Sequence, residues 1–426
     1  MNSSCSKDEA EPSSQSDSSE SQTNSEHDDV NSDRVDSDSV EEIEKTRTRD
    51  SADPIVIDAS NAGGQVLRIA NTLFFFTKKP ITVTNIRGHH GLRESHTHQV
   101  DMVVTMSNGR AEGNEEGSVE YTLWPSDAKT TATNKTFSFE SDWEFLTTFQ
   151  AVLPCFAFGR EKSTFRWCGE ELDSSLCLLD YVYFCQSILR PVLEKFGVHF
   201  DVVASGPDEI EEMIATVDAV KELKSVTMTS CDGDIDEIRA TIFHSGQYND
   251  RDPRTCAQEF EWNCIRILKE IFGTEVVIHC KTKYRMTYAR YWNPPRSSII
   301  LEIITSDECI LTAERFSWSP SWNFSYEESD SVDDAERIVR NLALDCKRAY
   351  GNRVCVRDHL TDQILLFMAL AKGTSTIRSD YPLPDDHWKK AISVIEELLD
   401  VKFSVRIEDE FIDISCEGIG MQNENF

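Results

Sequence analysis

The feature that most constrains the fold of this chain is an order of elements that recurs along it. The hydrophobic pattern predicts a strand at 54–58, helix at 66–73, strand at 81–86, helix at 96–107, and strands at 118–123 and 136–140. Residues 359–416 show the same order from its first helix onward, and residues 143–203 resemble another copy. We therefore predict an α/β protein built from repeated βαβαββ units.

The pattern changes between about residues 221 and 316. Two short strands precede a helix at 256–272, and three strands follow at 275–279, 299–305 and 308–313. We interpret this segment as a small inserted α+β domain. The predicted organisation is a tail at 1–53, a repeated-unit domain at 54–220 and 317–421, the insertion at 221–316, and a C-terminal tail at 422–426.

Charge is distributed unevenly along the chain. The net charge is −32, of which −11 falls in the Ser-, Asp- and Glu-rich residues 1–53. That stretch has too few apolar side chains to offset the entropy lost on ordering, so we expect a disordered acidic tail. Because phosphate binding draws on Lys and Arg, the acidic balance argues against broad electrostatic binding of nucleic acid. Any action on RNA must depend on a local basic site.

Cysteine usage indicates a reducing compartment. The chain has 13 cysteines, many of them in apolar segments such as that around Cys155, and no Cys-x-x-Cys pair. We expect buried thiols rather than a zinc ribbon or a disulfide framework. No apolar run approaches the roughly 18 residues of a membrane span, and the polar start lacks a signal peptide. We expect a nuclear protein of the nucleoplasm or nucleolus, or a cytosolic one, with no membrane partner.

Three segments carry a resemblance to a known family. The first is Ile-Asp-Ala-Ser-Asn-Ala-Gly-Gly-Gln-Val-Leu-Arg at 57–68, with Asn-Ile-Arg at 85–87 and Gly-Leu-Arg at 91–93. The second is Asp-His-Leu-Thr-Asp-Gln at 358–363 and the apolar run after it, and the third runs from His387 to the Gly-Ile-Gly-Met of 418–421. Over roughly residues 54–421 the chain resembles RNA 3'-terminal phosphate cyclases. One glycine pair is weak support, but the three segments in order are much more specific.

The resemblance implies both a fold and a reaction. The fold is a series of two-helix, four-strand units with a small inserted domain. The reaction uses ATP, with Mg²⁺ or Mn²⁺, and acts on RNA 3' ends. A histidine takes the adenylyl group from ATP, passes it to an RNA 3'-phosphate, and the neighbouring 2'-hydroxyl closes a 2',3'-cyclic phosphate and releases AMP.

The resemblance also implies site residues, and His387 is the adenylylated histidine. At the start of a predicted helix its imidazole is nucleophilic, and the helix N–H groups favour phosphate oxygens. The alternative for His387 is an ordinary exposed histidine. The remaining positions, each with a cap, cross-link or salt bridge as its alternative, are Gln65, Arg68, Gln150, His359, Asp362 and Gln363 at ATP, and Arg87 and Arg93 at the substrate phosphate. We expect His387, Asp362, Gln363 and Gln150 to converge on one cleft.

Several positions depart from the family pattern. Asn61-Ala62 replace the acidic residue thought to hold the metal, and His89-His90 replace an arginine. Glu170-Glu171 replace a glycine-rich segment and would repel phosphate, and Cys177 stands where a proline usually contacts the nucleotide. A lost metal ligand removes several kcal/mol of transition-state stabilisation. The alternative function is therefore a non-catalytic RNA- or protein-binding member of the same fold, with RNA-processing or ribosome-assembly partners.

Two further clusters have competing interpretations. His89, His90, His96 and His98 lie close together, but their spacing fits no known zinc pattern, so we predict no metal site there. Basic residues from Lys281 to Arg296 alternate with aromatic ones, which suits single-stranded RNA or, more plainly, a charged strand edge. An enolpyruvyl transferase on the same repeated fold lacks support, because we find no paired basic constellation.

Overall fold

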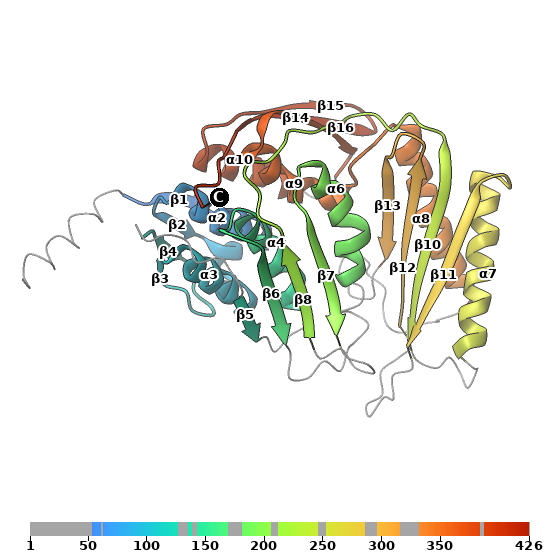
Figure 1. The fold of residues 1–426 in the computed structure, drawn as a ribbon, viewed down its shortest axis with the longest axis horizontal. Coiled ribbons are helices and arrows are strands. Elements are labelled where there is room, and N and C mark those ends of the chain that lie inside the picture. The colour runs from blue at the N-terminus through green and yellow to red at the C-terminus, as the bar shows by residue number, and fades with distance from the viewer. Residues whose placement is uncertain are drawn as a thin grey trace, which may run out of the picture. The chain divides into compact units, whose positions relative to one another are not determined.

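The structure is a computed structural model of the whole chain, shown in Figure 1. It describes residues 53–60, 63–126, 135–138, 143–168, 181–205, 212–245, 253–285, 296–315, 332–383 and 387–425. The acidic tail expected at 1–53 lies outside these residues apart from Asp53. Of the helices that the structure describes, none is long and apolar enough to cross a membrane.

The first unit has the predicted order of elements. It consists of one sheet and the helices that follow its strands: β1 (Ile55–Asp58), α2 (Gly64–Thr77), β2 (Ile81–Thr84), the short η1 (Ile86–His89), α3 (Glu94–Ser107), β3 (Arg110–Glu112) and β4 (Tyr121–Trp124). The sheet order is β1-β2-β4-β3, in which β1 and β2 are parallel and β4 is antiparallel to its neighbours. Alternating buried side chains on β2 and β4 face the helices.

The second unit repeats this topology. It contains β5 (Lys135–Ser138), α4 (Trp143–Ala157), β6 (Ser163–Cys168), the π-helical η2 (Phe184–Leu189), α6 (Arg190–Lys195), β7 (Phe200–Ser205) and β8 (Glu212–Val217). Its sheet order is β5-β6-β8-β7, with β5 parallel to β6. The strand expected at 136–140 was assigned to the first unit, and that assignment was wrong. Hydrophobic alternation predicts a strand but not its partner, and β3 closes the first sheet instead.

The third unit is split along the chain. Its members are β9 (Thr227–Met228), α9 (Asp358–Leu370), β14 (Lys372–Asp380), α10 (His387–Leu398), β15 (Phe403–Ile407) and β16 (Phe411–Ile419). The order β9-β14-β16-β15 matches the other two sheets, and β9 is parallel to β14. The missing first strand of the C-terminal copy is thus β9. The predicted α/β fold of repeated βαβαββ units is confirmed.

The insertion enters the third unit between β9 and α9. It comprises β10 (Ile235–Ser245), α7 (Pro253–Phe272), β11 (Val277–Arg285), β12 (Arg296–Thr305), β13 (Ile310–Arg315) and α8 (Val332–Gly351). The sheet order is β11-β10-β12-β13, and α7 and α8 pack together (Figure 1). A separate hydrophobic core contains Val339, Leu342 and Cys346 of α8. Because β9 pairs with β14, we propose boundaries of 235–351 for the insertion in place of 221–316.

Helix α2 is the centre of the main core. Ten of its 14 residues are buried, and it contacts α3, α4 and α10. One contact is a hydrogen bond from Thr72 Oγ1 to the carbonyl oxygen of Ala151 on α4, at 2.6 Å. The main core is continuous through all three units. Burial on this scale, at about 25 cal/mol per Å² of apolar surface, fixes the position of the α2 N-terminus.

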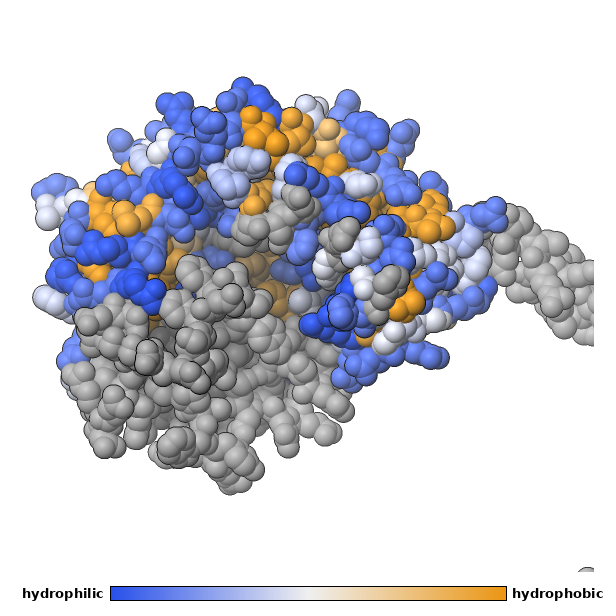
Figure 2. Space-filling model, turned by 180° about the vertical axis from the view of Figure 1, so that it is seen from behind, coloured by the Kyte–Doolittle hydropathy of each residue, from blue (hydrophilic) through white to orange (hydrophobic). Residues whose placement is uncertain are grey.

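The exposed surface of the described residues is largely polar. On the face shown in Figure 2, hydrophobic residues form small groups separated by hydrophilic ones. The exposed large apolar side chains come from different elements: Val56, Val119, Val203, Trp262, Val277, Leu344, Val405, Ile407 and Ile419. Scattered exposed apolar residues are normal for a folded protein and carry no functional meaning alone.

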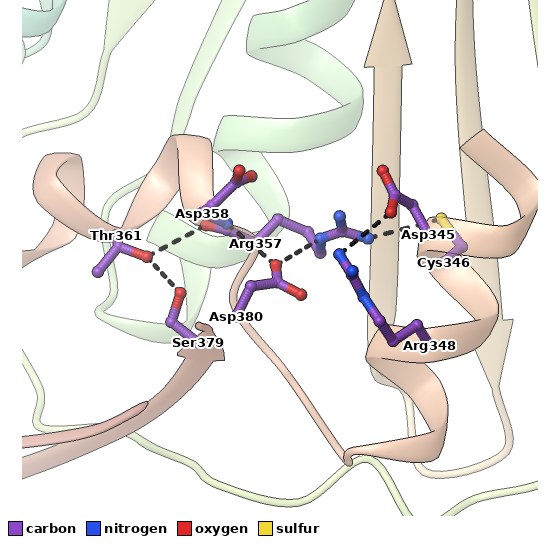
Figure 3. Close-up of polar contacts among 8 residues, drawn as sticks. All are labelled: Asp345, Cys346, Arg348, Arg357, Asp358, Thr361, Ser379 and Asp380. Atoms are coloured by element: carbon purple, nitrogen blue, oxygen red, sulfur yellow. Dashed lines mark hydrogen bonds and ion pairs between the residues drawn. The ribbon is translucent and has the colours of Figure 1, made fainter. Parts of the chain in front are cut away.

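A buried ion pair fixes the start of α9. Arg357 Nε lies 2.8 Å from Asp380 Oδ2 at the end of β14, and the two side chains are 8% and 10% exposed. Figure 3 shows the Arg357 guanidinium reaching from Asp380 towards Cys346 of α8, with Nη1 3.8 Å from the sulfur. Burial is the largest single effect and opposes the charge of Arg357, but Asp380 together with Cys346, Asp358 and Glu314 outweighs it and raises the pKa of Arg357. The ion pair lies within the third unit, and the contact of Arg357 with Cys346 joins that unit to the insertion.

We expect Asp380→Asn to destabilise the protein by about 3–5 kcal/mol, because it leaves a buried guanidinium without its counter-charge. Chemical denaturation followed by circular dichroism measures this loss. The control is Asp201→Asn, which breaks the half-exposed 3.1 Å ion pair with Arg190 and should cost less than about 1 kcal/mol. Equal losses in the two variants would contradict a special role for the buried pair.

Candidate active site

The N-terminus of α2 forms the floor of the candidate site. The helix begins at Gly64, its N-cap is Gly63, and no side chain caps it. The first turn has no acidic residue, so the partial positive charge of the helix end is not neutralised there. Buried Val66, Leu67 and Ala70 hold the helix in the core. An uncapped helix end of this kind suits phosphate oxygens.

His387 is the first residue of α10 and lies directly against this floor. A Cβ atom placed on Gly63 would be 3.2 Å from His387 Cε1 and 3.4 Å from Nε2. Helix α10 is held there by its buried face, which contains Trp388, Ala391, Val394, Ile395 and Leu398. Glycine at position 63 is therefore what leaves room for the imidazole. Both helix starts meet at this ring.

Four predicted site residues form one hydrogen-bond network. Arg68 Nε donates to Gln65 Oε1 at 2.9 Å, and Gln65 Nε2 donates to the main-chain oxygen of Asp362 at 3.3 Å. Gln363 Nε2 donates to Gln65 Oε1 at 3.4 Å and to Asp362 Oδ1 at 3.2 Å. Burial lowers the pKa of Arg68, while the negative charge of Asp362 acts in the opposite direction. The network joins the first turn of α2 to α9.

His96 is a residue that the sequence did not single out for this site. Its Nδ1 accepts a hydrogen bond from the Arg93 N–H at 3.1 Å, at the start of α3. Its Nε2 would lie 3.1 Å from a Cβ on Gly64, which is also 3.4 Å from Arg68 Nη1. His96 is 8% exposed. The sequence signal for His96 is its place among clustered histidines, whose spacing fits no known zinc pattern and does not indicate Gly64 as a neighbour.

Electrostatically, the site is a local cationic cluster in an acidic chain. Burial, followed by the charges of Arg68, Arg87 and Arg93 in that order, lowers the pKa of His96 to about 4. Burial also lowers the pKa of Arg87, and repulsion by Arg93 adds to this effect. Arg87 has a left-handed backbone, with φ 51°, and its Nη1 donates to the Gly91 oxygen at 3.3 Å. Three arginines that influence one imidazole make a site for an anion.

For the remaining predicted ATP contacts, Gln150 and His359, the structure describes less of the surroundings. Gln150 is half-buried on α4, and its neighbour Ala151 accepts the hydrogen bond from Thr72, one turn beyond Arg68 on α2. His359 lies in the first turn of α9, but its side chain is outside the described residues. The convergence of His387, Asp362, Gln363 and Gln150 on one cleft stays a prediction. Asn61-Ala62, Glu170-Glu171 and Cys177 are also outside the description.

The two other sequence clusters have different outcomes. His96 turns inward to Arg93, while the His89 side chain is not described. In the basic and aromatic cluster, Lys283 Nζ lies 3.6 Å from the ring centroid of Tyr183 in the second unit. This cation–π contact joins the insertion to the second unit. RNA binding by that cluster stays a prediction, because residues 286–295 are outside the description.

Comparison with known proteins shows the family to which the chain belongs. The family model for RNA 3'-terminal phosphate cyclase matches residues 59–405, so the chain belongs to this family, which uses ATP and acts on RNA ends. An RNA 3'-terminal phosphate cyclase from Drosophila melanogaster is 25% identical over 390 residues, covering 88% of this chain and 99% of the relative.

One solved structure with some likeness is the enolpyruvyl transferase NikO from Streptomyces tendae. It is 10% identical, with a TM-score of 0.33 and coverage of 87% of this chain. The chain spans 49% of that structure's length.

The depressed pKa of His96 predicts a pH-dependent stability. The pKa of this imidazole is near 6.5 in the unfolded chain and about 4 in the folded protein. Between these two pH values the unfolded state therefore binds a proton that the folded state does not bind. Stability should therefore fall as the pH falls through this window, by up to ~3 kcal/mol from His96 alone. Urea unfolding of wild type and His96→Asn at several pH values measures the difference, because asparagine keeps an acceptor without the titration.

The matched control is His90→Asn, which alters an exposed histidine in the segment between η1 and α3. We expect its stability to follow that of the wild type across this pH range. If His96→Asn also follows the wild type, the histidine does not titrate differently in the folded state.

Proposed function

We propose that this chain is an ATP-dependent RNA 3'-phosphate cyclase that works through an adenylylated His387. The observation that carries the proposal is the imidazole of His387 lying against Gly63 at the uncapped start of α2. Family membership supplies the reaction class, and an imidazole beside an uncapped helix N-terminus supports a nucleophilic role for His387. Gln65, Arg68, Asp362 and Gln363 are the proposed ATP contacts, and Arg87 and Arg93 the proposed contacts of the substrate phosphate.

The reaction balances as three displacements. A nitrogen of His387 attacks the α-phosphorus of ATP, a P–N bond forms, and pyrophosphate leaves. An oxygen of the RNA 3'-phosphate then attacks the same phosphorus and releases the imidazole. Finally the 2'-oxygen attacks the 3'-phosphorus, loses its proton, and displaces AMP. The amides of the α2 first turn and the guanidinium of Arg68 would stabilise negative charge on the phosphate oxygens in the first step.

The described residues do not fit a divalent metal ion at this site. The carboxylate of Asp58, at the end of β1, accepts hydrogen bonds from Ser60 and from Asn85 Nδ2, the latter at 3.0 Å. Among the described residues, no group of three or more His, Cys, Asp or Glu side chains could hold an ion. The Asn85 hydrogen bond, followed by those from Ser60, outweighs burial and lowers the pKa of Asp58. We derive no step through a metal.

A second function is favoured by a specific observation. Gln65, Arg68 and Gln363 already satisfy one another, and Gln65 bridges α2 to α9. Side chains that hydrogen-bond to one another can stabilise the fold without contacting ATP. This arrangement is therefore also compatible with a non-catalytic protein of the same fold that binds RNA or another protein. The Asn61-Ala62 and Glu170-Glu171 departures favour the same alternative. Such a protein would keep the cationic cluster but take up no nucleotide covalently.

Incubation with ATP labelled at the α-phosphate tests the proposal. We expect an acid-labile, alkali-stable adduct on the wild type, because a phosphoramidate behaves in this way, and none on His387→Ala. His90→Ala, an exposed histidine near the site, is the control and should keep the label. Absence of label on the folded wild type would favour the binding function.

Gly63→Ala tests the contact between the two helix starts. The added methyl group would lie 3.2 Å from His387 Cε1, so the imidazole must shift by a few tenths of an ångström. We expect adenylylation to slow roughly tenfold with little loss of fold stability, because a displaced nucleophile loses its alignment. Gly351→Ala, where an added Cβ meets nothing within 4 Å, is the control. Unchanged labelling in Gly63→Ala would contradict the proposed position of the nucleophile.

A further inference from the structure

Three separate segments meet where the insertion joins the third unit. They are the outgoing connection 229–234 between β9 and β10, the returning connection 352–357 between α8 and α9, and the turn 306–309 between β12 and β13. Asp232 N donates to Asp307 Oδ2 at 3.0 Å, and Ser306 N donates to the Asp234 oxygen at 2.9 Å. Asp232 also pairs with Arg353 Nε at 2.9 Å. The turn is thus fastened between both connections.

Each of these segments carries one cysteine: Cys231, Cys309 and Cys355. We call these three side chains the thiol cluster. Cys231 is buried in the core of the insertion, and Cys309 and Cys355 pack against that core. Cys309 is the member of the cluster that influences, or is influenced by, both other thiols, because Cys231 and Cys355 each shift its pKa. The Cys355 thiol also donates to the Arg353 oxygen, with the sulfur 3.7 Å from it.

A cavity gives access to two of the three thiols. It has a volume of about 450 Å³ and lies between α6, the turn 306–309 and the start of α9. Cys309 and Cys355 line it, together with Ser230 and Arg357, whereas buried Cys231 does not. A hydrogen bond from Cys231 lowers the pKa of Cys309, but the one with Cys355 and burial outweigh it and raise this pKa to about 12. Cys309 therefore stays a protonated thiol until its partner reacts.

We propose that Cys309 and Cys355 form a reversible disulfide when the protein meets hydrogen peroxide. The Cys355 sulfur attacks one peroxide oxygen, the O–O bond breaks, and a sulfenic acid and water form. The Cys309 sulfur then attacks the Cys355 sulfur and loses its proton, and the sulfenic oxygen leaves as water. Two thiols are oxidised and one peroxide is reduced to two waters. A small thiol reductant reverses the change by exchange.

The disulfide would add a covalent link between the insertion and the third unit. Cys309 belongs to the insertion, and Cys355 lies three residues before α9 of the third unit. The cross-link would restrain the insertion against the helix that carries Asp362 and Gln363. Its formation depends on the thiol cluster and the cavity alone, and so it stands or falls independently of the adenylyl-transfer proposal. Transient disulfides of this kind occur in reducing compartments as redox sensors.

Peptide mapping of the full-length protein tests the inference. After mild hydrogen peroxide treatment, we expect one linked peptide pair joining Cys309 to Cys355, which dithiothreitol abolishes. Cys309→Ser and Cys355→Ser should each lose it, and Cys231→Ser should keep it. Cys280→Ser is the matched control, because Cys280 is a half-buried thiol of the same insertion with its own thiol neighbour, Cys264. This control should keep the Cys309–Cys355 link.

Two results would overturn the inference. One is free Cys309 and Cys355 in wild type at a peroxide dose that oxidises other cysteines, and the other is a bond from either thiol to a different cysteine. Wild-type mapping needs no variant, so misfolding of a serine variant cannot hide either result. As a second readout, the oxidised wild type should unfold at a higher temperature than the reduced protein, because the cross-link restricts the unfolded chain.

Discussion

The packing of α2 inside the repeated units is the constraint on which the rest of the structure depends. This helix is buried on most of its surface and contacts one helix from each of the second and third units, as well as α3 of its own. Its N-terminus consequently has little freedom to move. The missing side chains of Gly63 and Gly64 leave room for the imidazoles of His387 and His96. A site built on a rigid helix end is preorganised by the same apolar contacts that fold the protein.

Charge around this helix end opposes the charge of the chain as a whole. A protein with a net charge of −32 brings Arg68, Arg87 and Arg93 close enough to depress the pKa of His96. Proximity of like charges costs free energy unless an anion or a carboxylate offsets it. Asp362 offsets part of that cost at Arg68. The remaining positive charge is local, which is the arrangement that a phosphate site in so acidic a chain would require.

Much of this could be predicted from the sequence. The amphipathic helices and alternating strands gave the unit order correctly, because periodicity reports which face of an element is buried. The partner of the strand at 135–138 could not be predicted, because hydrophobic alternation does not specify which strand lies beside it. The position of β9 could not be predicted either, because a strand of two residues, Thr227–Met228, has no visible period. Motifs named His387, Gln65 and Asp362, whereas His96 emerged only when its ring was seen beside Gly64. That neighbour comes from tertiary packing, which local pattern does not encode.

The division of the third unit has a consequence for how the chain assembles. Strand β9 is synthesised long before β14, the strand that it pairs with, and the entire insertion lies between them. The insertion has its own hydrophobic core, and so it has the contacts to fold as a unit. Once compact, it brings the two connections together and shortens the effective loop that β9 must close. A compact insertion would in this way help to close the third sheet that it interrupts.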